Sequence, residues 1–135
     1  MGPFGESVIE HRETIQGIDR IAAVVDAAIQ AADAGEVIRS HLELRGERLW
    51  AGGTSFQLRR ESRLILISLG KAAGAMTRAA MEVTGGRITH GVCVPKHAAP
   101  DLAAFTNIEV VIGSHPVPGA GSLQAGKRIQ DLVSG

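Results

Sequence analysis

Apolar residues recur at helical spacing in the first part of the chain. From Ile18 they form one stripe along an amphipathic helix that we expect to end near Gly35. The members of this stripe are Ile18, Ile21, Ala22, Val25, Ala28, Ile29 and Ala32. A second, shorter helix is predicted over residues 36–42, before a polar connection that contains three glycines. The pattern thus predicts two helices ahead of the main fold.

The pattern changes after Arg63, where residues 64–68 form a continuous apolar run that ends in a serine. Such a run is typical of a strand that is covered on both faces, and it predicts a central parallel strand. A tight turn at residues 69–71 then leads into a predicted helix over 72–83, which a pair of glycines ends. This segment is a strand, a tight turn and a helix.

Two more strands are predicted at residues 90–95 and 108–112, and a Gly- and Pro-rich loop over 113–121 leads into a last helix from about Ser122. Strands and helices alternate, so the predicted class is α/β: an incomplete Rossmann-like parallel sheet with helices on both faces, preceded by N-terminal helices. In an α/β fold, a helix that follows a strand normally leads back to another parallel strand. No strand is predicted after the last helix, so we expect the α/β domain to be incomplete. Residues 1–17 are predicted to be a flexible leader, and residues 18–135 the N-terminal part of the α/β domain.

Charge and composition exclude several classes of function. The 14 basic residues balance 14 acidic ones, and the aromatic residues are one tryptophan and three phenylalanines. A chain without net charge or an aromatic platform is a poor partner for nucleic acid. The single cysteine cannot form an internal disulfide, and no apolar run approaches the length of about 20 residues that crosses a bilayer. We therefore expect a cytoplasmic protein without a membrane span.

The turn after the first predicted strand is the best candidate for chemistry. Gly70 allows a sharp turn, Lys71 adds a mobile positive charge, and the start of the following helix favours an anion. Ligands collect at the carboxyl ends of such strands, so this turn suits a carboxylate or a phosphate. The alternative is that Gly70 only makes the turn and Lys71 is a solvated surface charge. The turn matches neither a Walker A loop, since Ala72 replaces the serine or threonine, nor a dinucleotide fingerprint.

A second candidate is the loop after the third predicted strand, which contains Ser114 and His115. In a parallel sheet this loop lies at the same edge as Gly70 and Lys71, so the two loops are expected to share one cleft. The imidazole of His115 donates, accepts or carries charge near neutral pH, and two prolines stiffen its loop. A structural histidine that bonds the backbone is the alternative.

The set His90, Cys93 and His97 is spaced closely enough to suggest a metal site. On a strand, however, His90 and Cys93 point to opposite faces because they are an odd number of residues apart. We therefore predict no metal ligands among these residues, and interpret Cys93 as a small buried hydrophobic residue.

Three ordered segments resemble those of the glycerate 2-kinase family, also called hydroxypyruvate reductases in older naming. Residues 69–76, LGKAAGAM, are similar to the family's L-G-K-A-a-x-x-M segment. Residues 91–97, GVCVPKH, are similar to its G-v-v-v-x-k-y-G-h strand and loop, and residues 108–118, IEVVIGSHPVP, to its i-e-v-x-e-a-G-H-P-V-P-D segment. The resemblance covers about residues 18–133, including the opening helices.

This resemblance implies that the γ-phosphate of ATP, with Mg²⁺, is transferred to the 2-hydroxyl of D-glycerate in a cleft between two α/β domains. It implies that Lys71 is the catalytic residue, acting on an anionic substrate or on charge that develops at the phosphoryl group. Gly70, Lys71, Ser114 and His115 are expected to bind substrate or phosphate. Homo-oligomerisation is left open, and no nucleic acid or membrane partner is expected.

The chain departs from the family pattern at several points. Gly119 replaces the aspartate after H-P-V-P, which removes a helix cap or loop anchor, and the Tyr-Gly before His97 is missing. The family's S-G-G-x-S-A-L loop and second domain are not within these 135 residues. We therefore expect this chain alone to be inactive, and keep as alternative a non-catalytic fragment that binds anions or contacts another subunit. A nicotinamide reductase is disfavoured because the dinucleotide fingerprint is missing.

Overall fold

The computed structural model describes residues 17–135, and every structural statement below concerns these residues. The predicted flexible leader, residues 1–17, lies outside this range except for Gly17.

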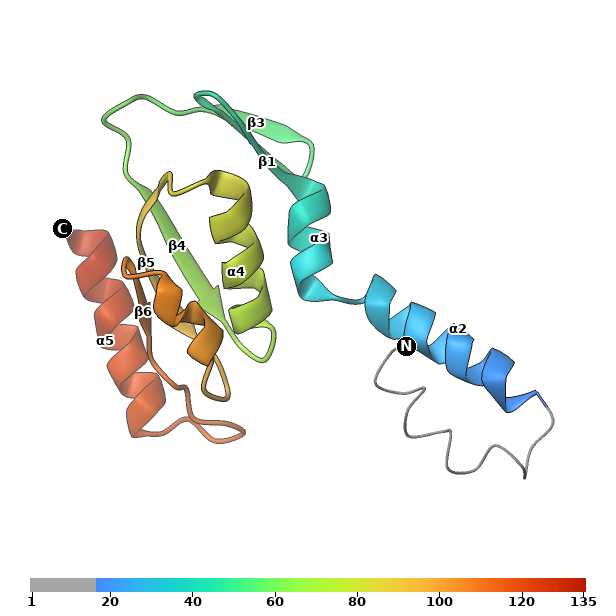
Figure 1. The fold of residues 1–135 in the computed structure, drawn as a ribbon. Helices are drawn as coiled ribbons and strands as arrows, with labels where there is room; N and C mark the ends of the chain where they lie inside the picture. The colour runs from blue at the N-terminus through green and yellow to red at the C-terminus, as the bar shows by residue number, and fades with distance from the viewer. Residues whose placement is uncertain (1–16) are drawn as a thin grey trace.

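Two helices open the described chain, α2 (Ile18–Ala31) and α3 (Ala34–His41). The single helix expected to reach Gly35 ends earlier, because the side chain of Asp33 accepts a hydrogen bond from the backbone N–H of Glu36 at 2.9 Å and so begins α3. Helix α2 projects away from the body of the molecule, whereas α3 lies beside it (Figure 1).

A small antiparallel sheet follows α3, with strands β1 (Leu42–Arg45), β2 (Arg48–Ala51) and β3 (Thr54–Gln57) in the order β1-β2-β3. The prediction of a polar connection here was wrong. Three glycines at positive φ make the two tight turns that join the strands: Gly46, Gly52 and Gly53. Leu49 lies opposite both Leu44 and Phe56, so the three side chains share one face of this sheet.

The main sheet is parallel and has strands β4 (Leu64–Leu69), β5 (Ile88–Val94) and β6 (Ile108–Val110) in the order β4-β5-β6. Within the described residues β5 is therefore the central strand and β4 an edge strand, contrary to the prediction for residues 64–68. The side chains of Ile67 and Leu69 are 40% and 62% exposed. The continuous apolar run thus predicted a strand correctly, but it did not predict that this strand lies at the edge of the sheet.

Helices cover both faces of this sheet, as predicted. Helix α4 (Ala73–Thr84) and a short 3₁₀ helix, η1 (Pro100–Ala104), pack on one face, and α5 (Ala120–Ser134) packs on the other (Figure 1). Neighbouring residues of β5 point to opposite faces, so Cys93 joins the core under α4 while Val92 joins the core under α5. The α/β class is confirmed.

Helices α3 and α4 are joined by charged side chains. Arg39 of α3 donates to Glu82 of α4, with Nη2–Oε2 at 2.9 Å, and pairs with Glu36 of its own helix at 2.8 Å. The pKa of Arg39 is raised, first by its hydrogen bond to Glu82 and then by the nearby negative charges, while desolvation opposes the shift. These contacts hold α3 against the outer side of α4.

Within residues 17–135, none of the helices has the length and apolar character needed to span a membrane.

Candidate functional site

The carboxyl ends of the three parallel strands lie at one edge of the main sheet, and backbone hydrogen bonds join the loops that begin there. The N–H of Gly70, after β4, donates to the carbonyl oxygen of Val94 at 3.0 Å. The N–H of Gly113, after β6, donates to the carbonyl oxygen of Pro95 at 3.0 Å. The three loop starts are therefore held side by side by main-chain contacts.

These loops line a small, open pocket of about 150 Å³. All four residues that the sequence singles out contribute to its walls: Gly70, Lys71, Ser114 and His115. The expectation that two loops share one cleft is therefore met in the structure. The pocket also contains two polar residues that sequence reasoning missed, Lys96 and Ser122.

The first loop owes its shape to Gly70, which has a φ of 103° in the left-handed region that side chains other than glycine rarely adopt. Its carbonyl oxygen accepts a hydrogen bond from the N–H of Ala73 at 3.1 Å, so the turn passes directly into α4. Lys71 lies between these two residues and is exposed. The turn thus presents its ammonium group at the sheet edge.

The loop with Ser114 and His115 is tied to the first turn of α5. The hydroxyl of Ser122 accepts a hydrogen bond from the N–H of Ser114 at 3.1 Å and donates to the carbonyl oxygen of Ser114 at 3.4 Å. The helix itself begins at Ala120, earlier than the predicted start near Ser122. Its N-cap is Gly119, which makes no side-chain cap hydrogen bond, as expected where the family's aspartate is replaced.

Close backbone packing at this helix start demands a residue without a side chain. A Cβ atom added to Gly121 would overlap the carbonyl oxygen of Ile112, at the beginning of the same loop. The absence of a side chain at position 121 therefore lets α5 begin directly against the end of the third strand.

The pocket carries positive charge only. Its walls include two lysines and one histidine, and no aspartate or glutamate. Within residues 17–135 neither Lys71 nor Lys96 takes part in an ion pair. Helices α4 and α5 both begin beside this edge, where their partial positive charge adds to that of the lysines. This arrangement suits an anion.

The pocket does not fit the cofactors that the family resemblance implies. Mg²⁺ prefers oxygen ligands and is usually held by carboxylates, which the walls lack. A volume of about 150 Å³ is below the roughly 300–1,000 Å³ of sites that enclose whole small-molecule ligands, so a complete nucleotide would extend beyond these walls.

The described residues contain no group of three or more His, Cys, Asp or Glu side chains that could hold a metal ion. Cys93 is fully buried in the core under α4, whereas His90 is exposed. The interpretation of Cys93 as a buried hydrophobic residue is thus confirmed.

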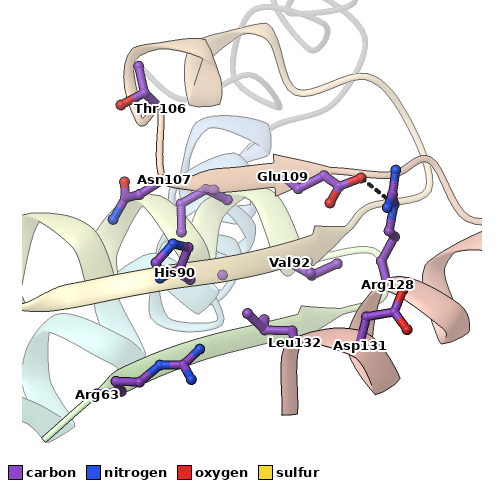
Figure 2. Close-up of a pocket in the computed structure, with 11 residues that line it drawn as sticks. Arg63, His90, Val92, Thr106, Asn107, Glu109, Arg128, Asp131 and Leu132 are labelled. Carbon is purple, nitrogen blue, oxygen red and sulfur yellow. Dashed lines mark ion pairs between the residues drawn. The ribbon is translucent and has the colours of Figure 1, made fainter. Parts of the chain in front are cut away.

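A larger, open hollow of about 780 Å³ lies over the opposite half of the sheet, against the last turns of α5 (Figure 2). Arg63 and His90 point into it from the sheet side, and Arg128 of α5 pairs with Glu109 of β6 at 3.0 Å. Both signs of charge line this hollow, and none of the predicted site residues does. Because ligands of such sheets bind at the carboxyl ends of strands, the pocket at Lys71 is the better candidate.

Lys96 was within reach of sequence reasoning. It lies two residues after the end of β5, so the rule that singled out Gly70 and Lys71 at the end of one strand applies to it as well. Ser122 gave no comparable indication, because its role depends on where the loop folds back onto α5.

Fold and site together define an α/β protein with a cationic pocket at the carboxyl edge of a parallel sheet. The family model described as "Domain of unknown function (DUF4147)" matches residues 20–135, and the chain belongs to this family. Two curated relatives carry glycerate kinase names, which confirms the resemblance to the glycerate kinase family.

The chain is 37% identical to the D-glycerate 2-kinase of Thermotoga maritima over 71 residues, which cover 53% of this chain and 17% of that protein. It is 29% identical to the glycerate kinase of Danio rerio over 127 residues, which cover 85% of this chain and 25% of that protein. The crystal structure of the PH0495 protein from Pyrococcus horikoshii OT3 has the same fold, with a TM-score of 0.71, 23% identity, and coverage of 90% of this chain and 26% of that one. The chain thus spans about a quarter or less of the length of these relatives.

Proposed function

We propose that this chain is the N-terminal part of a cytoplasmic D-glycerate 2-kinase, and that the pocket at Lys71 binds anionic groups of its reactants. One observation carries the proposal. The four residues that the family resemblance assigns to substrate or phosphate, Gly70, Lys71, Ser114 and His115, line a single pocket that contains no acidic side chain.

In the proposed reaction the 2-hydroxyl oxygen of D-glycerate forms a bond to the γ-phosphorus of ATP, while the bond between that phosphorus and the bridging oxygen to the β-phosphate breaks. ADP leaves with the electron pair of the broken bond, and the hydroxyl proton passes to solvent water. Lys71 acts through its charge, by orienting the anionic substrate and by offsetting negative charge on the phosphoryl oxygens. ATP and Mg²⁺ remain expectations of the family, and no step here depends on how they are held.

A second candidate is anion binding without catalysis. Its support is the same pocket, which offers positive charge and hydrogen-bond donors but no carboxylate to accept the hydroxyl proton. In this case the chain retains affinity for small anions and transfers no phosphoryl group.

An ATP-dependent assay with D-glycerate separates the two candidates. It is run on the 135-residue chain and on a version extended through the downstream coding sequence, each with and without the substitution Lys71→Ala. Activity that depends on Lys71 in either version supports the kinase. Absence of activity in both, together with anion binding by the 135-residue chain, supports the second candidate.

A further inference from the structure

Lys96 occupies a different position in the pocket from Lys71. It lies two residues after the end of β5, the central strand, and is half-buried, whereas Lys71 lies exposed on the turn before α4. Lys96 forms no ion pair within residues 17–135, and no acidic side chain lines the pocket beside it. A bound carboxylate would supply that missing partner.

The small volume of the pocket limits what it can hold. A short organic acid fits within about 150 Å³, whereas an adenosine would extend beyond these walls, and the acid-free walls repel no anionic group. Both properties match the smaller of the two substrates of the proposed kinase.

We infer that this pocket is the subsite for the hydroxy acid, and that Lys96 recognises its carboxylate and so determines that acids rather than neutral polyols bind. The inference rests on the proposed function. The carboxylate keeps its charge throughout phosphoryl transfer, so Lys96 contributes equally to substrate and transition-state binding and acts on KM. Lys71 instead meets charge that changes during the reaction, and acts on kcat.

Binding is tested by NMR titration of the ¹⁵N-labelled chain with D-glycerate, with glycerol, which has the hydroxyl groups but no carboxylate, and with ATP. D-glycerate is expected to shift the amide signals of Gly70, Gly113 and Ser114, and glycerol is expected to leave them in place. If glycerol shifts them as strongly as D-glycerate, if D-glycerate shifts none of them, or if ATP displaces bound D-glycerate from them, the inference is wrong.

The role of Lys96 is tested with Lys96→Gln, Lys96→Arg and the matched control Lys127→Gln, since Lys127 is an exposed lysine of α5 outside the pocket. Loss of a charged hydrogen bond weakens binding roughly 10- to 100-fold. We expect Lys96→Gln to weaken D-glycerate binding by that factor with an otherwise unchanged spectrum, Lys96→Arg to retain part of the affinity, and Lys127→Gln to behave as wild type. Equal affinity of Lys96→Gln and wild type overturns the assignment.

Kinetics separate a failure of this inference from a failure of the proposed function. In a version of the protein that phosphorylates D-glycerate, Lys96→Gln is expected to raise KM for D-glycerate and leave KM for ATP unchanged. A rise in KM for ATP alone contradicts the assignment of the pocket to the hydroxy acid but is compatible with the proposed kinase function. If the protein binds carboxylates through Lys96 but has no kinase activity, the assignment of the acid subsite stands and the proposed kinase function is wrong.

Discussion

The hydroxyl groups of Ser68 and Thr77 share a hydrogen bond inside the protein, between the end of β4 and the middle of α4. Thr77 is fully buried and Ser68 is 8% exposed. The bond lies just ahead of the Gly70 turn, so it joins the strand and the helix that together present Lys71.

This bond predicts a non-additive effect of two substitutions on stability. Ser68→Ala leaves the Thr77 hydroxyl buried without its partner and is expected to lower the free energy of unfolding by about 1–3 kcal/mol. The double variant Ser68→Ala/Thr77→Val removes both polar groups, so it should lose less than the sum of the single variants. Guanidinium unfolding of all four proteins measures the coupling, and strictly additive losses would contradict a shared bond.

Lys71 is expected to matter for activity and hardly at all for stability. It is exposed and forms no ion pair within residues 17–135. Removing a group that stabilises transition-state charge typically lowers kcat roughly 10²–10³-fold, and we expect this of Lys71→Ala in a version of the protein that is active. The melting temperature should remain that of the wild type. Lys127→Ala is the control. A large loss of stability in Lys71→Ala would indicate that Lys71 stabilises the fold and would contradict this prediction.

Two glycines of α5 are predicted to respond in opposite directions to substitution by alanine. The added Cβ of Gly121→Ala overlaps the carbonyl oxygen of Ile112, and such overpacking costs about 1–3 kcal/mol. At Gly126, in the same helix, no atom outside the local backbone of the helix lies within 4 Å of the added Cβ, so alanine should stabilise the helix by roughly 0.5–1 kcal/mol. Thermal unfolding compares the two, and a Gly121→Ala variant at least as stable as wild type would argue against the close contact.

Arg39 is expected to contribute to stability in a way that mildly alkaline pH does not change. Its pKa is raised in the folded protein, mainly by the hydrogen bond to Glu82. A cation with a raised pKa stabilises the fold below its unfolded pKa and loses this contribution only as pH rises through the folded value, which here lies above the ordinary pKa of arginine.

The variant Arg39→Met should therefore lower the melting temperature slightly, and by the same amount at neutral and mildly alkaline pH. Arg45→Met, which removes a pair confined to β1, is the control. A difference between wild type and Arg39→Met that shrinks over this pH range would contradict the assignment.

The sequence predicted the main sheet better than the region before it. The apolar run 64–68 and the repeats at 72–83 sufficed to place β4 and α4 within one residue at each end. The order of the strands in the sheet could not be predicted in the same way. Whether β4 is a central or an edge strand depends on the strands that pair with it, and its own residues do not encode this.

The antiparallel sheet was missed although its pattern was present. Leu42 and Leu44 alternate with charged residues in β1, and a Gly-Gly pair separates β2 from β3, a combination that favours a hairpin. Strands of four residues carry too short an alternation to stand out from a polar loop. The helix break at Asp33 was missed for a related reason, because the alanines around it continue the helical pattern and only the capping contact interrupts it.

For the candidate site, the rule that ligands bind at the carboxyl ends of parallel strands predicted from the sequence alone that Lys71 and His115 lie at one edge of the sheet. The same rule passed over Lys96, because the loop after β5, in which Pro95 precedes this lysine, contains no glycine-rich turn. The contact between Ser122 and Ser114 depends on the path of a loop and had no counterpart in any local pattern.

The main-chain bonds from Gly70 to Val94 and from Gly113 to Pro95 have a consequence for how this site can diversify. Because these bonds join backbone groups and involve none of the side chains at positions 71, 96 and 115, we expect that these side chains can be exchanged one at a time without displacing the loops. Such an edge is a suitable starting point for changing ligand preference, whether by natural drift or by directed evolution, while the underlying sheet stays the same.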